Sequence, residues 1–208
     1  MSSCEDGLAG PTEQVGDASA SGHITLLFTV QADSPEPLLQ GSRGAGLCID
    51  SDQPVCEVHA MATPGEGRVV ASGDFADGRL HSTVIEELAL LIPEMADYDW
   101  SFEQVCRLPT QQGFGLSAAG ALSAAMAAQR ALGLDEEDSR ARSFHIAHLV
   151  ERRLSGGLGD VAALWAGGVD LRREPGCPDF GEPAELGGPG LVESWHEEIS
   201  MILAWRET

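Results

Sequence analysis

The pattern of apolar and polar positions predicts a chain that mixes strands and helices. Short segments that combine β-branched, aromatic and polar residues predict strands, and longer runs rich in Ala, Leu, Met and Glu predict helices. Strands are expected at 23–30, 46–50, 55–60, 68–71 and 101–108, and helices at 80–92, 118–132 and 135–154. This order, with no internal repeat, indicates an α/β domain.

The two ends of the chain are expected to lie outside this domain, which is predicted to span residues 22–172. Residues 1–21 are small and polar and predict a mobile N-terminal extension. Residues 173–190 are crowded with Pro, Gly and acidic residues and predict a linker. An apolar strand is expected at 198–205, so residues 191–208 are predicted to begin a second domain that is truncated or degenerate. A strand without its sheet would expose apolar side chains and unpaired backbone groups.

A glycine-rich loop connects the strand predicted at 101–108 to the next helix. It reads Pro109-Thr-Gln-Gln-Gly-Phe-Gly-Leu-Ser-Ala-Ala-Gly120. In such a loop several backbone N–H groups and a helix N-terminus can converge on one anion. Ser117 stands at the helix start, where its hydroxyl can cap the helix or reach a metal ion. The loop therefore predicts a phosphate-binding site.

The absence of lysine limits which phosphate site this loop can form. All 12 basic residues are arginine. A Walker A loop and a protein-kinase site each need a lysine, so both are excluded, and Schiff-base chemistry is excluded with them. A loop that holds phosphate with backbone amides, a helix dipole and a metal ion is compatible with the composition.

The loop has three alternative interpretations. In the first, the glycines serve only to turn the chain into a tightly packed helix. A dinucleotide-binding fingerprint would need an acidic residue at the end of a second strand, but Asp135 follows a helix end. A nucleophile elbow centred on Ser117, with Asp160 and His196 as partners, would need the strand to run straight into the serine. Here eight residues lie between Leu108 and Ser117.

Two carboxylates further along the chain are candidates for the same site. Glu151 closes an amphipathic run, and Asp160 follows a glycine-rich turn at the start of another helical run. The two side chains can converge on the loop from different elements, one to hold a metal and the other a hydroxyl group. The structural alternative is that Asp160 only caps a helix and Glu151 is a solvated helix residue.

These segments resemble the GHMP small-molecule kinases, a family named for galacto-, homoserine, mevalonate and phosphomevalonate kinases. The family signature, Pro-x-x-x-Gly-Leu-Gly-Ser-Ser-Ala-Ala, is similar to the run from Pro109 to Ala119, with departures at Phe114 and Leu116. In mevalonate-kinase-like members a catalytic aspartate precedes Gly-Gly by seven residues, as Asp160 does here.

Within the family, the chain most resembles the archaeal pantoate kinases, which make 4-phosphopantoate for coenzyme A. The similar motifs are Gly22-His-Ile-Thr25, Gly41-Ser-Arg-Gly-Ala-Gly46 and Gly157-Leu-Gly-Asp160. Ser21 departs from the usual Pro-Gly-His-Ile, and the resemblance covers roughly residues 20–175. It implies a two-layer α+β domain like domain 2 of ribosomal protein S5, followed in the family by a ferredoxin-like domain.

The resemblance also implies an ATP-dependent kinase for a small hydroxy acid. Pantoate is the expected substrate, and mevalonate and homoserine are the alternatives. A non-catalytic relative and a Ser-Asp-His hydrolase are the alternative functions. ATP and Mg²⁺ are the expected cofactors, with Asp160 orienting or deprotonating the acceptor hydroxyl and with Ser117 and Glu151 holding the metal. The residues expected to bind ATP are Pro109, Gln112, Gly113, Phe114, Gly115, Leu116, Ser117, Ala118 and Ala119.

The substrate carboxylate requires a cation, and without lysine this must be an arginine. Arg43, in its Gly-Ser-Arg-Gly loop, is the expected carboxylate ligand, with a plain surface arginine as the alternative. His23 is expected to line the same pocket.

Net charge and cysteine content describe the expected surroundings. The 33 acidic residues give a net charge of −21, which disfavours nucleic acid and anionic membranes as partners. It suggests a halophilic protein, although the loss of lysine can also reflect a GC-rich genome, and the resemblance implies an archaeal source. Five cysteines without Cys-x-x-Cys spacing indicate reduced thiols and a cytoplasmic location. Neither a membrane span nor a signal peptide is expected. The sequence does not decide whether the chain forms a homodimer.

Overall fold

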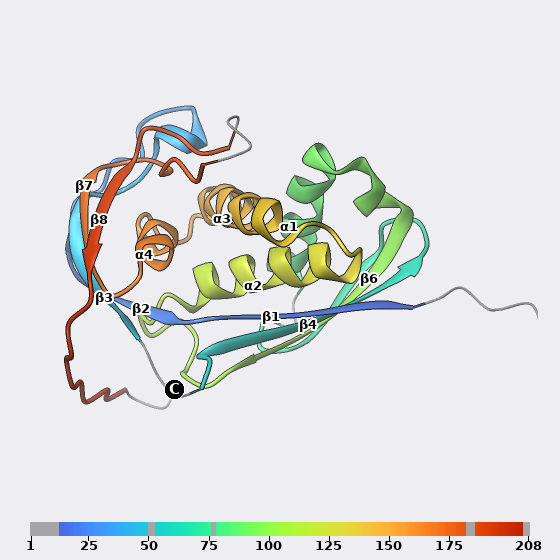
Figure 1. Cartoon of the computed structure of the whole chain (residues 1–208), viewed down its shortest axis with the longest axis horizontal. Coiled ribbons are helices and arrows are strands. Elements are labelled where there is room, and N and C mark those ends of the chain that lie inside the picture. Colours follow the sequence, from blue (N-terminus) through green and yellow to red (C-terminus); the bar gives the residue numbers. More distant parts are fainter. Residues whose placement is uncertain (1–12, 50–52, 76–77, 182–185, 206–208) are drawn as a thin grey trace, which may run out of the picture.

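Two four-stranded sheets enclose four α-helices in the computed structural model (Figure 1), which describes residues 13–49, 53–75, 78–181 and 186–205. The sheets meet at an angle, and the helices lie on the inner side of both. No helix among these residues is long and apolar enough to cross a membrane.

The first sheet has the strand order β1-β4-β6-β5. Its strands are β1 (Gln14–Ala20), β4 (Cys56–Pro64), β5 (Val69–Gly73) and β6 (Tyr98–Cys106). All neighbours are antiparallel except β5 and β6, which are parallel. Alternate residues of β4 are buried, because successive side chains of a strand point to opposite faces and only one face is covered by helices.

The second sheet has the order β2-β3-β7-β8 and is antiparallel throughout. Its strands are β2 (Gly22–Phe28), β3 (Gly44–Ile49), β7 (Val169–Glu174) and β8 (Leu191–Trp195). Only Ser21 separates β1 from β2, so the chain passes directly from one sheet into the other.

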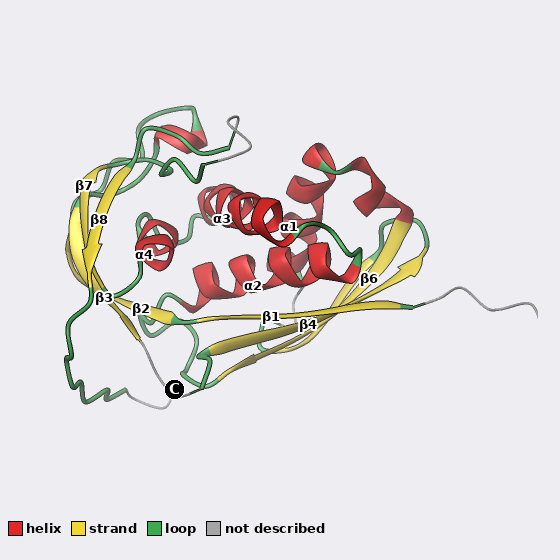
Figure 2. Ribbon diagram, viewed as in Figure 1, coloured by secondary structure: helices red, strands yellow, loops and turns green. Residues whose placement is uncertain are grey.

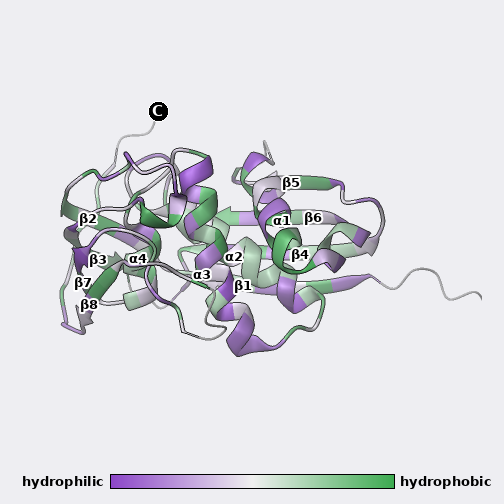
Figure 3. Ribbon diagram, turned by 90° about the horizontal axis from the view of Figure 1, so that it is seen from above, coloured by the Kyte–Doolittle hydropathy of each residue, from purple (hydrophilic) through white to green (hydrophobic). Residues whose placement is uncertain are grey.

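Helix α2 (Leu116–Ala131) is the centre of the core (Figure 2). It packs on β1, β4 and α3 (Glu136–Arg153). The other helices are α1 (Arg79–Leu91) and α4 (Asp160–Ala166), and short 3₁₀ turns lie at Pro37–Leu39 and Pro93–Asp97. Half of the α2 residues are alanines, which lie on the green, hydrophobic side of the colour scale in Figure 3, so the helix can approach its neighbours closely. The largest buried side chains around it are Trp100, Phe102, Leu88, Met95 and Ile146.

Strand β1 corrects one prediction from the sequence. Residues 14–20 were expected to belong to a mobile extension, but they pair with β4 along their whole length, from Gln14 opposite Ala62 to Ala20 opposite Cys56. Their small size has a packing reason, because a Cβ on Gly16 would lie 2.2 Å from the carbonyl oxygen of Ala127 in α2. The rest of the expected extension, residues 1–12, lies outside the described residues.

The C-terminal segment differs from its prediction as well. The last strand is β8 at 191–195 rather than 198–205, and residues 196–205 have no regular secondary structure. Within the expected linker, Cys177, Phe180 and Leu186 are buried, and Phe180 packs against Trp165 with ring centroids 5.0 Å apart. The segment therefore returns the chain to the second sheet, where β8 finds its partner in β7.

This pairing predicts that β8 stabilises the domain. A chain ending at Gly190 should lose about 2–5 kcal/mol of unfolding free energy, because several ladder hydrogen bonds of about 0.5–1.5 kcal/mol each disappear. A chain ending at Trp195 keeps β8 and is the matched control. Urea unfolding followed by circular dichroism measures both, and equal stability of the two chains would show that β8 contributes nothing.

Candidate functional site

The glycine-rich loop between β6 and α2 has the backbone conformation that its sequence suggests. Gly113 and Gly115 have φ angles of 82° and 65°, in the left-handed region that favours glycine. Gly115 precedes the first residue of α2, so the loop delivers its amides to the helix N-terminus. The N–H of His23 donates to the carbonyl of Phe114 at 3.0 Å and holds the loop against β2.

Several loop residues bury their side chains, so only their backbone is available to a ligand. The side chains of Phe114 and Leu116 are buried in a small apolar cluster with Ile49 and Val55. Both residues depart from the signature of the family that the loop resembles, and this cluster gives the departures a packing role. Ala118 and Ala119 are also buried, while Pro109 and Gln112 are partly exposed and Gly113 is exposed. Among the residues expected to bind ATP, the polar side chains that are not buried are therefore those of Gln112 and Ser117.

Ser117 donates a hydrogen bond to Oε1 of Glu151, and the N–H of Gly157 donates to Oε2 of the same carboxylate at 2.5 Å. Glu151 is 1% exposed, and burial raises its pKa because the charged form loses its hydration. The guanidinium of Arg152 donates to the carbonyls of Gly156 and Gly157, each at 2.6 Å, and so fixes the turn. A Cβ on Gly156 would lie 2.6 Å from Glu151, so this turn requires glycine there.

Asp160 lies beside this carboxylate at the start of α4. A Cβ on Gly157 would lie 2.1 Å from Oδ2 of Asp160 and 3.1 Å from Oε2 of Glu151, so the two carboxylates flank one glycine. The charge of Asp160 contributes to the raised pKa of Glu151. Thr25 Oγ1 lies 3.5 Å from Oδ1 of Asp160. The expected convergence of Ser117, Glu151 and Asp160 is thus present.

A buried chain of charges holds Asp160 from behind. His23 bonds Oδ1 of Asp160 through Nδ1 at 2.7 Å and Oδ2 of Asp170 through Nε2 at 2.8 Å. Ionised carboxylates only accept, so both ring nitrogens donate and the imidazole carries two protons. Burial lowers the pKa of His23, but the hydrogen bonds and charges of the two carboxylates outweigh it, and the pKa is raised overall.

Asp170 also binds Nη1 of Arg172, which is 3% exposed. Nε and Nη2 of Arg172 are buried and have no hydrogen-bond partner among the described residues. A Cβ on Gly159 would lie 2.4 Å from Oγ of Ser42 and 2.6 Å from Nε of Arg172. The guanidinium therefore lies directly behind Gly159 and Ser42.

Those two residues help to line a cleft of about 340 Å³, together with Thr25, Phe28, Asp160 and residues 156–158. Asp160, the side chain expected to carry the chemistry, therefore faces a cavity large enough for a small molecule. The buried guanidinium of Arg172 lies behind the same cleft, and two of its nitrogens, Nε and Nη2, have no hydrogen-bond partner among the described residues.

Two residues predicted to bind substrate are placed elsewhere. Arg43 is 53% exposed, pairs with Glu174 at 2.6 Å and does not line the cleft. His23 is fully buried behind Asp160, so its contact is with the carboxylate rather than with the cavity. Arg43 directly follows Ser42, a residue of the cleft, but its own side chain pairs with Glu174 at the surface.

The sequence reasoning missed Ser42, Asp170 and Arg172. A signal for the last two was present in β7, because residues two apart in a strand face the same side. Asp170 and Arg172 alternate with Val169 and Leu171 in this strand, and it is the charged pair that is buried most deeply. When an acidic residue and an arginine lie two positions apart in a strand, they can form a buried ion pair that faces the interior.

The donor atoms fit a small divalent cation bound together with phosphates. Mg²⁺ takes oxygen ligands and usually uses one or two carboxylates, with the other positions filled by phosphate and water. Ser117 and Glu151 supply a hydroxyl and a carboxylate beside the loop. The described residues contain no group of three or more His, Cys, Asp or Glu that could hold a metal alone. The site thus fits a cation that arrives with its phosphate ligands.

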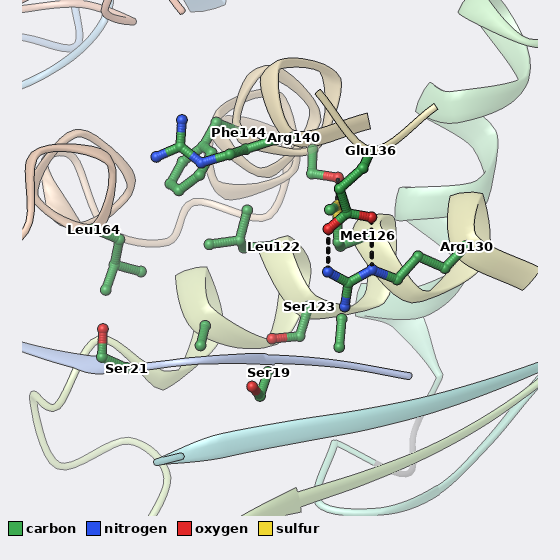
Figure 4. A pocket seen from close by; sticks show the side chains of 13 residues that line it. Ser19, Ser21, Leu122, Ser123, Met126, Arg130, Glu136, Arg140, Phe144 and Leu164 are labelled. Atoms are coloured by element: carbon green, nitrogen blue, oxygen red, sulfur yellow. Dashed lines mark hydrogen bonds and ion pairs between the residues drawn. The ribbon is translucent and has the colours of Figure 1, made fainter. Parts of the chain in front are cut away.

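A second hollow of about 320 Å³ lies between β1, α2 and α3 (Figure 4). Arg130 and Glu136 form an ion pair at its wall, and the guanidinium of Arg140 lies 3.9 Å from the ring centroid of Trp165. None of the residues predicted to be functional lines this hollow. The candidate chemistry is therefore at the cleft beside Asp160.

Comparison with known proteins agrees with this geometry. Residues 83–168 match the family model described as the GHMP kinases N terminal domain, a span that includes the loop, Ser117, Glu151 and Asp160. The pantoate kinase of Thermococcus kodakarensis is 33% identical over 160 residues, covering 76% of this chain and 52% of that protein. The pantoate kinase of Methanospirillum hungatei is 31% identical over 165 residues, covering 78% and 54%.

A solved structure described as a phosphotransferase related to the CoA biosynthesis pathway superposes with a TM-score of 0.70 at 28% identity, covering 88% of this chain and 58% of that one. The chain spans about half the length of the curated relatives it matches. The α/β fold and the family resemblance expected from the sequence are confirmed.

The charge chain predicts an unusual dependence of stability on pH. The pKa of His23 is higher in the folded chain than the value of 6.5 expected when unfolded, so its contribution to stability is complete below about pH 6.5 and is lost as pH rises through the folded value. Compared with His23→Gln, the wild-type chain should therefore lose its stability advantage toward alkaline pH. Urea midpoints measured across this range test the prediction.

His148 is the matched control, because its contribution to stability should depend on pH in the opposite direction. Its Nε2 donates to the carbonyl of Pro37 at 3.0 Å, and burial lowers its pKa to about 4. Its contribution should therefore be present above pH 6.5 and be lost as pH falls toward 4. If His23→Gln and His148→Asn shifted the pH profile in the same direction, the assignment of a protonated His23 would be wrong.

Proposed function

We propose that this chain, which belongs to the GHMP kinase family, is the nucleotide-binding part of an enzyme that transfers the γ-phosphoryl group of ATP to the primary hydroxyl of pantoate. The observation that carries the proposal is the convergence of the α2 N-terminus, the Ser117–Glu151 pair and Asp160, with Asp160 at the wall of the cleft. Because the chain spans about half of its relatives, the proposal concerns the activity of the protein to which this domain contributes.

The loop would bind the ATP phosphates through its backbone. The first N–H groups of α2 have no partner within the helix, and the N-terminal end of the helix dipole is positive. Gly113 and Gly115 supply the left-handed conformations that direct the loop into the helix, and neither glycine presents a side chain to the phosphates. Without lysine, these amides and the dipole are the protein's main source of positive potential at the loop.

Ser117 and Glu151 would hold magnesium. When bound, the cation would neutralise charge on the β- and γ-phosphates. Glu151 is nearly completely buried, and desolvation raises its pKa even though the hydrogen bonds from Ser117 and Gly157 and the charge of Arg152 act in the opposite direction. A cation next to Oε1 would favour the ionised form, and the Gly157 N–H bond to Oε2 would keep the carboxylate oriented.

Asp160 would position the acceptor hydroxyl. Its Oδ1 is bonded to His23, while Oδ2 lies beside Gly157. Because Oδ1 already accepts a hydrogen bond from His23, we assign Asp160 orientation of the hydroxyl first and acceptance of its proton as phosphoryl transfer proceeds. Phosphoryl transfer relies mostly on positioning and charge neutralisation, which makes this division of labour sufficient.

Arg172 would bind the substrate carboxylate, in place of Arg43. A carboxylate and a guanidinium form two parallel hydrogen bonds, and Nε and Nη2 of Arg172 have no partner among the described residues. Ser42, which lines the cleft in front of this buried guanidinium, offers a hydroxyl. The cleft volume suits a small hydroxy acid, and the relatives named pantoate kinase favour pantoate within that class.

The hydrolase alternative is disfavoured by the partner of Ser117. A serine nucleophile needs a histidine base within hydrogen-bond reach, but this hydroxyl is bonded to Glu151. His23, the histidine of the site, is occupied by Asp160 and Asp170.

Asp160→Asn is the direct test of the proposed mechanism. The substitution should lower kcat roughly 10²-fold or more, because the proton acceptor is lost, while ATP binding stays nearly unchanged because the loop is intact. Asp138→Asn, at an exposed aspartate in the first turn of α3, is the control. Pantoate-dependent release of ADP measures turnover, and calorimetry measures ATP binding. A full rate in the variant, or ADP release that does not require pantoate, would contradict the proposal.

The assignment of the carboxylate ligand is tested by two matched substitutions. Arg172→Lys retains the charge but loses the planar pair of donors, so we expect the KM for pantoate to rise by roughly 10-fold or more with the KM for ATP unchanged. Arg43→Lys should leave both constants unchanged, because that guanidinium pairs with Glu174 at the surface. If Arg43→Lys raised the KM for pantoate and Arg172→Lys did not, Arg43 would be the carboxylate ligand.

A further inference from the structure

We infer that Cys56 and Cys106 form a modification site, a dithiol that a low-molecular-weight disulfide converts into a disulfide within the folded chain. Cys56 is the first residue of β4, and Cys106 is the last residue of β6, three residues before Pro109 at the start of the glycine-rich loop. The two face each other across the antiparallel strands with their sulfur atoms 3.8 Å apart. This inference does not depend on the proposed kinase activity.

The register of the strands makes this pair suitable for closure. The N–H of Arg107 donates to the carbonyl of Val55 at 2.9 Å, which identifies Cys56 and Cys106 as a pair that does not exchange backbone hydrogen bonds. The N–H of Cys106 instead donates to Asp74 at 2.8 Å. In such pairs the Cα atoms lie about 4.5 Å apart and the side chains are close. This separation lies within the range of about 4.4–6.8 Å found for disulfides.

The two thiols differ in access and in acidity. Cys56 is fully buried, whereas Cys106 is partly exposed. The pKa of Cys106 is lowered because its thiolate accepts hydrogen bonds, first from the Cys56 thiol and then from the amide of Gln104. The pKa of Cys56 is raised by the same thiol pair and by burial. Cys106 is therefore the attacking thiolate, and Cys56 is the resolving thiol.

The reaction balances with two molecules of thiol released for each disulfide consumed. The Cys106 thiolate attacks one sulfur of the small disulfide, forms a mixed disulfide and expels the first thiolate, which takes a proton from water. Cys56 then loses its proton and attacks the sulfur of Cys106, which expels the second thiolate. The chain loses two hydrogens in total, and the small disulfide is reduced.

The surroundings of the pair connect it to the rest of the site. The Nε2 of Gln104 lies 3.4 Å and 3.6 Å from the two sulfurs, and its Oε1 lies 3.0 Å from His81. Gln104 also lies against α2, since a Cβ on Gly120 would come within 2.4 Å of Nε2. Closing the disulfide would bring the sulfurs to about 2.05 Å and draw the end of β6 toward β4.

Mass spectrometry of the folded chain tests the inference. A Cys4→Ser background removes the cysteine that lies outside the described residues. The protein is incubated with oxidised glutathione, its remaining thiols are alkylated, and the digest is searched for a peptide that joins residues 56 and 106. We expect this peptide, with a mass lower by two hydrogens, while Cys48 and Cys177 are recovered alkylated. Cys177 is fully buried and has a raised pKa, so it should react slowly.

The digestion has to separate neighbouring cysteines. Without lysine, trypsin leaves Cys48 and Cys56 together on residues 44–68, whereas cleavage before Asp50 and Asp52 divides them. Recovery of both Cys56 and Cys106 in alkylated form, or a link between other cysteines, would overturn the inference.

Three variants test the order of the two steps. Cys56→Ser should stop at a glutathione adduct on Cys106, and Cys106→Ser should form neither the adduct nor the link. Cys48→Ser should form the link as the parent chain does. An adduct that appears on Cys56 first, or no adduct on Cys106 in Cys56→Ser, would also overturn the inference. The measurement on the parent chain remains decisive if a variant fails to fold.

Discussion

The site depends on one buried chain of alternating charges, Asp160–His23–Asp170–Arg172, which connects α4, β2 and β7. Desolvating any one of these charges alone would be costly, and removing one partner of a buried pair typically costs about 3–5 kcal/mol. Because each charge is neutralised by the next, the start of α4 is held against the second sheet at one position. The location of Asp160 is therefore set by electrostatic pairing more than by the seven-residue helix that carries it.

Close approach of small residues sets the other half of the site. The alanine-rich helix α2 lies against β1 at Gly16 and against Gln104 at Gly120, contacts that leave no room for a side chain. Its N-terminus, with Ser117 in the first turn, is thereby brought to Glu151 at the end of α3. Phe114 and Leu116 anchor the loop in the apolar cluster with Ile49 and Val55. Packing thus positions the phosphate loop, and charge pairing positions the aspartate.

The parts of this arrangement that the sequence predicted are those with a local signal. The loop, Ser117, Glu151 and Asp160 lie at element ends with glycine-rich turns, and their side chains do come together. Arg172 was missed because charged residues two apart in β7 do not by themselves show that their face is buried, and its neighbours Gly159 and Ser42 come from other segments. Residues 14–20, which form β1, were expected to be mobile because they are small and polar, although close packing against α2 requires a small residue at Gly16. Arg43 was favoured by its loop, but Glu174 is its partner at the surface.

Because the whole chain is strongly negative, an anionic ligand would depend on local groups of the site for its attraction. A net charge of −21 repels ATP and a carboxylate at long range, and several surface arginines, among them Arg68, Arg107 and Arg173, are already paired with glutamates. On the proposed function, attraction would come from groups that act at contact distance, namely the α2 N-terminus, the donors of Arg172 that have no partner among the described residues, and a cation beside Glu151. Salt screens the long-range repulsion beyond about 10 Å at 0.1 M but weakens buried contacts much less. With an acidic surface around a partly buried anion site, added salt therefore reduces the cost of approach more than the gain on binding.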